Sequence, residues 1–152
     1  MLLRGLMAGA VLISGAAGLA QSVQPCSNAN LGAVSGLKPS TDNQKLFANG
    51  KTIFKLLDAG TEKSKMIIQI SSPPFKEDGT KTCQVIAFTA EEGFDKILLD
   101  QLDALYDPSI GLLFDIPVST PETPDKWTLL QINLNQATGK LDADFMGYIG
   151  VN

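Results

Sequence analysis

The chain has 152 residues, a formal net charge of −4 at pH 7 and no histidine. Its one arginine, Arg4, lies in an apolar N-terminal stretch, so the rest of the chain carries 11 lysines against 16 acidic residues. Nucleic acid repels a negative chain that lacks guanidinium donors for phosphate, and we expect no nucleic-acid partner. The absence of imidazole also excludes Ser-His-Asp and Cys-His catalysis and histidine-ligated metals.

Residues 1–20 have the three-part pattern of a secretory signal peptide. A short segment with Arg4 precedes an apolar run, and the small residues Gly18 and Ala20 occupy the −3 and −1 positions of a cleavage site. The apolar run is shorter than the roughly 20 residues that a membrane-spanning helix requires. We predict cleavage after Ala20 and a periplasmic or secreted mature chain without a membrane span.

Cys26 and Cys83 are the only cysteines, and they are 57 positions apart. Two cysteines in an exported chain most simply form one disulfide, and no Cys-x-x-Cys spacing indicates redox work. In the chain-entropy model such a loop closure contributes on the order of 4 kcal/mol. We predict that the disulfide joins an extended N-terminal arm, residues 21–40, to a core strand of a single domain, residues 41–152.

The first regular element, residues 42–58, has two interpretations. Thr41-x-x-Gln44 resembles a capping box and Gly60 is a stop signal, which favours a helix. Asn49-Gly50 is instead typical of a β-hairpin turn. We predict the helix because apolar residues recur at helical spacing, at Leu46, Phe47, Ile53, Phe54 and Leu57.

Two apolar runs then predict a β-hairpin. Residues 65–71 are rich in β-branched side chains and end before Pro73-Pro74, and residues 83–88 form the second run. Asp78-Gly79 between them is a turn signal.

The following segment has the pattern of an amphipathic helix from Thr89 to Pro108. Thr89-x-x-Glu92 resembles a second capping box, and the proline ends the pattern. The predicted apolar face consists of Phe94, Ile97, Leu98, Leu102 and Leu105, with Lys96, Asp100, Asp103 and Asp107 opposite.

The C-terminal third predicts three strands with alternating apolar and polar residues, at 112–118, 130–134 and 141–145. Pro117 suggests an edge position or the end of pairing for the first of them. The pattern predicts a polar loop at residues 119–126 and a turn at residues 137–140.

The predicted fold class is therefore α+β, with the element order α-β-β-α-β-β-β. One antiparallel sheet of about five strands with both helices on one face would bury these apolar stripes. This order resembles that of roadblock/longin and profilin-like domains. The resemblance implies a fold and no function.

The remaining candidates for chemistry are carboxylates, and we predict no catalytic, cofactor-binding or metal-binding residue among them. Glu91 and Glu92 fit a helix cap, and Asp100, Asp103 and Asp107 fit a solvated helix face. Asp142 and Asp144, expected to face Asn133 and Asn135, could bind calcium weakly, but the twelve-residue calcium loop is absent.

We expect a non-catalytic exported module that binds another protein or a cell-envelope component. The proposed contact surface is a sheet edge and the 119–126 loop, with Val118, Pro121, Pro124 and Trp127. An exposed apolar patch beside that loop would support this function. The alternatives are a small carboxylate-dependent hydrolase of envelope polysaccharide, which needs two acids converging in a cleft, and a carrier of a small apolar ligand, which needs an internal cavity.

Overall fold

The computed structural model describes residues 22–28, 43–58 and 66–151. The predicted signal peptide and the greater part of the predicted arm lie outside these residues. In the described part of the chain no helix is long and apolar enough to cross a membrane.

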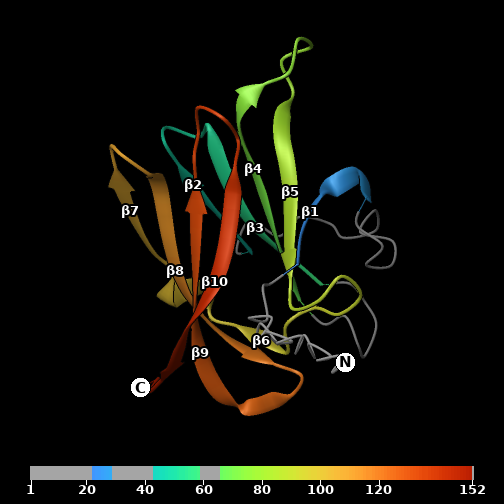
Figure 1. Ribbon diagram of the computed structural model, residues 1–152, viewed down its shortest axis with the longest axis vertical. Helices are drawn as coiled ribbons and strands as arrows, with labels where there is room; N and C mark the ends of the chain where they lie inside the picture. The colour runs from blue at the N-terminus through green and yellow to red at the C-terminus, as the bar shows by residue number, and fades with distance from the viewer. Residues whose placement is uncertain (1–21, 29–42, 59–65, 152) are drawn as a thin grey trace, which may run out of the picture.

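The described residues fold into a sandwich of two antiparallel sheets (Figure 1). The first sheet has the order β1-β5-β4-β3-β2, and its strands are β1 (Ser22–Pro25), β2 (Gln44–Phe47), β3 (Thr52–Leu57), β4 (Ile67–Phe75) and β5 (Lys81–Ala87). The second has the order β10-β9-β8-β6, with β7 also paired to β8, and contains β6 (Lys96–Ile97), β7 (Asp103–Asp107), β8 (Gly111–Thr120), β9 (Thr123–Leu134) and β10 (Leu141–Ile149).

The α+β prediction is therefore wrong, and the resemblance to roadblock/longin and profilin-like domains fails with it. The described residues contain strands and two short 3-10 turns, Cys26–Asn28 and Leu99–Gln101, but no α-helix. Each sheet covers the apolar face of the other, which is the role that the sequence pattern assigned to helices.

A cluster of phenylalanines joins the two sheets. Phe114 on β8 is fully buried, and its ring centroid lies 5.4 Å from that of Phe54 on β3 and 5.0 Å from that of Phe47 on β2. Alternate residues of β8 and β9, among them Ile116, Leu130, Ile132 and Leu134, are fully buried around this cluster. The strict alternation that predicted these strands arises because only one face of each strand meets the other sheet.

The predicted helix at 42–58 is a β-hairpin, the alternative that Asn49-Gly50 indicated. β2 and β3 pair antiparallel, and Ala48, Asn49 and Gly50 between them all have positive φ. Asn and Gly tolerate this left-handed backbone better than other residues, which makes the turn locally favourable. The helical spacing of the apolar residues was coincidental.

The predicted helix from Thr89 to Pro108 is also wrong. The Thr89 hydroxyl accepts a hydrogen bond from the Glu91 backbone N–H, so the capping-box residue forms a turn. Gly93 packs so closely on Met66, the residue before β4, that a Cβ there would lie 2.5 Å from the Met66 carbonyl oxygen, and Phe94 pairs with Met66. The chain continues through β6 and a 3-10 turn into β7.

The other predicted strands are confirmed, with longer boundaries. β4 and β5 form the expected hairpin, although β4 continues through the cis bond between Pro73 and Pro74. Pro117 lies in a central strand and not at an edge. On the side of β8 away from β9, the pairing with β7 ends at Asp115 and the pairing with β6 begins at Val118. Pro117 lies in the gap between them, where no backbone N–H is needed for pairing.

Replacing Phe114 with alanine should lower the free energy of unfolding by about 3–5 kcal/mol, because it leaves a cavity between the sheets. The measurement is urea denaturation of Phe114→Ala. The control is Leu105→Ala, whose side chain is 65% exposed and whose loss should change stability by less than about 0.5 kcal/mol. Equal effects would contradict the assignment of the core.

Candidate functional site

The segment predicted as a polar loop, residues 119–126, is a tight hairpin between two long strands. Thr120 pairs with Thr123, and their hydroxyl oxygens are 2.9 Å apart. The Thr123 backbone N–H also donates to the Thr120 hydroxyl at 3.2 Å. These contacts satisfy polar groups at the turn and fix the end of the second sheet.

A β-bulge in β10 shapes the neighbouring surface. The register between β9 and β10 shifts between Phe145 and Gly147, and Gly147 has a φ of +124°, which side-chain-bearing residues rarely adopt. The Thr128 hydroxyl donates to the Gly147 carbonyl at 2.8 Å and holds the bulge in place. Phe145 and Tyr148 pair with Leu130 and Thr128, so both aromatic side chains lie on the face that is buried elsewhere in the sheet.

Beside this bulge lies an open groove of about 260 Å³, which we call the aromatic groove. Tyr148 is 66% exposed at its rim, and Lys126 Nζ lies 5.0 Å from the centroid of the tyrosine ring. This cation–π contact comes from a diagonal pair on β9 and β10, and it orients the tyrosine. The groove is lined by Phe88, Thr120, Glu122, Thr123, Thr128, Phe145, Gly147 and Tyr148.

The base of the aromatic groove continues into the core. The Phe145 ring centroid lies 6.4 Å from that of Phe88, which follows β5, and 6.4 Å from that of Phe94. Phe88 and Phe94 are buried, whereas Phe145 is half-buried. The groove therefore has a rigid floor and an exposed aromatic wall, which is a typical arrangement for an anchor site.

The residues proposed from the sequence as a contact surface lie around this groove but do not form it. Val118 is fully buried and pairs with Ile97 on one side and Thr128 on the other, so it contributes neither surface nor edge. Pro124 is exposed, and Pro121 and Trp127 are half-buried. Trp127 pairs with Ile149 and so faces the side of the sheet opposite to Tyr148.

Sequence reasoning missed Phe145 and Tyr148 as site residues. Phe145 was assigned to the buried face of an ordinary strand that ended there, Tyr148 lay beyond the predicted strand, and the bulge that turns both rings toward one face is not visible in the pattern. Gly147 between them was the available signal, since a glycine inside a strand often marks a bulge.

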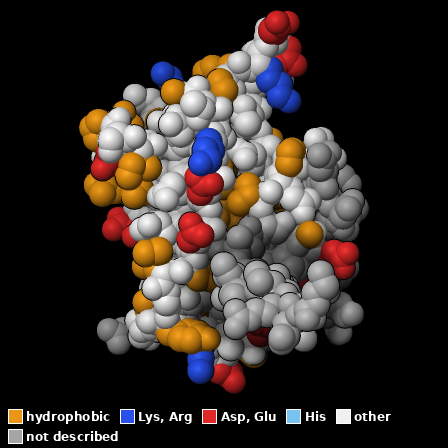
Figure 2. All heavy atoms as spheres, in the orientation of Figure 1, with side chains coloured by type: hydrophobic (Ala, Val, Ile, Leu, Met, Phe, Trp, Pro, Cys, Tyr) orange, Lys and Arg blue, Asp and Glu red, His pale blue; other side chains and the backbone are white. Residues whose placement is uncertain are grey.

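A second exposed apolar group lies at the hairpin between β7 and β8. Its members Leu105, Tyr106 and Ile110 are 65%, 62% and 42% exposed. The hollow beside Tyr106 has a volume of about 190 Å³ and is lined largely by polar residues and backbone. On the face shown in Figure 2, apolar side chains form several separate groups with carboxylates between them, so exposure alone does not select one of these groups.

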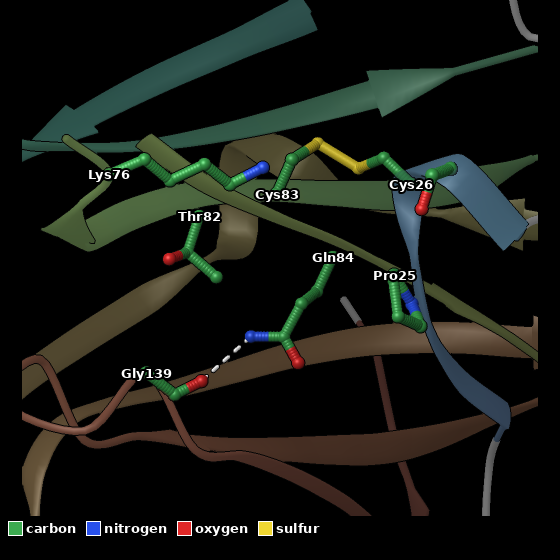
Figure 3. A pocket seen from close by; sticks show the side chains of 8 residues that line it. Pro25, Cys26, Lys76, Thr82, Cys83, Gln84 and Gly139 are labelled. Atoms are coloured by element: carbon green, nitrogen blue, oxygen red, sulfur yellow. Dashed lines mark hydrogen bonds between the residues drawn. A yellow bond between two sulfur atoms is a disulfide. The ribbon is translucent and has the colours of Figure 1, made fainter. Parts of the chain in front are cut away.

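The predicted disulfide between Cys26 and Cys83 is present. It joins the turn after β1 to β5, and Gln69 Nε2 donates to Cys83 Sγ at 3.1 Å. A hollow of about 530 Å³ lies beside it, with Lys76 and Thr82 in its wall (Figure 3). Gln84 Nε2 crosses this hollow to donate to the Gly139 carbonyl at 2.8 Å, which ties the first sheet to the turn between β9 and β10.

Among the described acidic residues, Asp103 and Asp115 lie opposite each other on β7 and β8, and the other predicted candidates lie apart. Asp100 lies in the 3-10 turn, whereas Asp103 and Asp107 lie at the two ends of β7. Asp142 pairs with Asn133 and forms an ion pair with Lys140 at 3.3 Å, and Asp144 faces Gln131. Within the described ranges, no three acidic or cysteine side chains are grouped so that they could hold a metal ion.

In the part of the chain that the structure describes, two carboxyl groups have a lowered pKa, and both belong to turns. Hydrogen bonds from the Thr80 hydroxyl and backbone N–H lower the pKa of Asp78, and those from Ser109 lower the pKa of Asp107. Both carboxylates are exposed, and they stabilise the turns between β4 and β5 and between β7 and β8. A general acid requires the opposite shift, so neither has the character of a proton donor.

Comparison with models of protein families, with curated proteins and with solved structures finds no match to this chain.

Removing the disulfide should lower the free energy of unfolding by about 4 kcal/mol, because the 57-residue separation makes the closed loop long. The measurement is chemical denaturation of the Cys26→Ser, Cys83→Ser double variant against the oxidised protein. The control is the oxidised protein with added reductant, which should reach the stability of the double variant. An unchanged stability in both samples would contradict the structural role.

The Asp107 carboxyl should titrate below its usual value of 3.8, and its midpoint should rise toward that value in Ser109→Ala, because the variant loses the hydroxyl donor. Carboxyl chemical shifts followed by NMR provide the measurement. Because the folded pKa is the lower one, this contact stabilises the fold above the unfolded pKa, and the stabilisation is lost as pH falls through the folded pKa. An identical midpoint in both proteins would contradict this cause.

Proposed function

We propose that this chain is an exported, non-catalytic binding module that holds a protein partner in the aromatic groove. The observation that carries the proposal is the exposed Tyr148 ring, which is in cation–π contact with Lys126 and lines a groove together with Phe88 and Phe145. Tyrosine combines large apolar area with few rotatable bonds, and such residues are enriched at protein interfaces.

Several features support export and a scaffold role. The disulfide is typical of a protein that matures in an oxidising compartment, and the N-terminal pattern fits a cleaved signal peptide. Both cysteines are used in that bond. The stiff two-sheet core can present a groove without rearrangement, which reduces the entropy cost of binding.

The alternatives receive less support. A polysaccharide hydrolase needs two carboxyl groups facing each other across a cleft. The cross-strand acids Asp103 and Asp115 lie on the outer face of the second sheet and line none of the three hollows described above. A carrier of a small apolar ligand needs an enclosed cavity of about 300–1,000 Å³. The aromatic groove is smaller and open, and the larger hollow at the disulfide is crossed by the Gln84 side chain.

The test is a quantitative pull-down with residues 21–152 from the exported fraction of the source cells. Tyr148→Ala should reduce recovery of a stoichiometric partner at least about tenfold, as expected for an interface anchor. Tyr106→Ala is a matched control, because that tyrosine is 62% exposed against 66% for Tyr148. Loss of the partner with Tyr106→Ala alone would move the site to the hairpin between β7 and β8 and contradict the proposal.

A further inference from the structure

We propose that the partner binds as an extended strand that adds to the edge of β10, with apolar residues on one face and lysine or arginine on the other. This inference rests on the proposed function and names the chemistry of the partner. Strand addition uses main-chain hydrogen bonds for affinity and alternate side chains for specificity.

β10 lies at one edge of the second sheet. Among the described residues β10 pairs with β9 alone, and β1 of the first sheet lies close to β10 without pairing with it. β10 has nine residues from Leu141 to Ile149, longer than the four-residue β1 or β2 at the edges of the first sheet. The aromatic groove is built in part from the same strand, through Phe145, Gly147 and Tyr148.

The two faces of β10 carry side chains of different chemistry. Phe145 and Tyr148 lie on the inner face, at the groove. Asp142 and Asp144 are exposed on the outer face, where their partners on β9 are Asn133 and Gln131. Because side chains of a strand alternate between faces, an added strand must place every second residue beside the groove and the others beside the acids.

The charges on and near β10 are complementary to a basic strand. Asp125 is exposed on β9, two residues before the partner of Ile149 at the end of β10, and adds to the acidic character of that side of the sheet. Lys126 contacts the Tyr148 ring, and Lys140 forms an ion pair with Asp142, so Asp144 is the main site on β10 for a basic residue of the added strand. A basic strand would meet opposite charges along β10, whereas a second copy of β10 would bring acids next to acids.

The probe is an acetylated, amidated peptide of eight residues that alternates lysine and valine. It should bind the full mature chain at least about tenfold more tightly than the same peptide with glutamate in place of lysine. Asp144→Lys should reverse this preference, and Asp103→Lys, an exposed acid on β7 at the far side of the same sheet, should leave it unchanged. Equal affinity for both peptides would overturn the charge argument.

Backbone pairing is tested by N-methylation of the lysine–valine peptide. In an added strand the N–H groups of alternate residues point toward β10 and the others point away. Methylation of the valine nitrogens and methylation of the lysine nitrogens should therefore have different effects on affinity. One pattern should weaken binding at least about tenfold, and the other should leave it nearly unchanged. Equal effects, or no binding of the parent peptide, would overturn strand addition.

These outcomes separate the two proposals. Partner recovery that depends on Tyr148, combined with equal effects of the two methylation patterns, would leave the proposed function standing and remove the strand-addition mechanism. Equal recovery of the partner with Tyr148→Ala and Tyr106→Ala would contradict the proposed function itself.

Discussion

The fold depends on the burial of two sheet faces against each other, and the contact of Phe114 with Phe54 and Phe47 is its centre. A single antiparallel sheet with one apolar face is not stable in water, because that face must be covered. Here the second sheet provides the cover, and hydrogen bonds from Gln84 to Gly139 and from Gln136 to Thr52 connect the sheets at the turn between β9 and β10. The disulfide between Cys26 and Cys83 links the turn after β1 to β5 and so holds β1 at the edge of the first sheet.

The aromatic groove is a consequence of this packing at the other end of the second sheet. Phe88 directly follows β5 and is buried, whereas Tyr148 on the opposing sheet is exposed. The apolar inner face therefore reaches solvent between these two residues. The bulge at Gly147 and the hydroxyl of Thr128 hold the tyrosine on that face. The groove and the cation–π contact of Tyr148 with Lys126 distinguish this end of the molecule from the other exposed apolar groups, and they are the basis of the proposed function.

The sequence predicted the strands whose inner and outer residues alternate strictly, such as Ile116, Leu130 and Ile132, because burial on one face imposes that period. It failed where apolar residues coincide with a helical period by chance. Leu105 was placed on an apolar helix face and is 65% exposed, and Gly93, inside that predicted helix, is required for close approach to Met66. The pairing of Cys26 with Cys83 was predictable from composition, whereas the groove depends on a bulge and on contacts between distant residues such as Phe88 and Phe145.

The most direct test of the account is amide hydrogen exchange of the mature chain, resolved residue by residue by NMR, in the presence and absence of the bound partner. If the partner adds a strand to β10, new main-chain hydrogen bonds at that edge should slow exchange from Asp144 to Ile149 and leave β7 unchanged. Slower exchange confined to β7 and its hairpin, with β10 unaffected, would contradict the account.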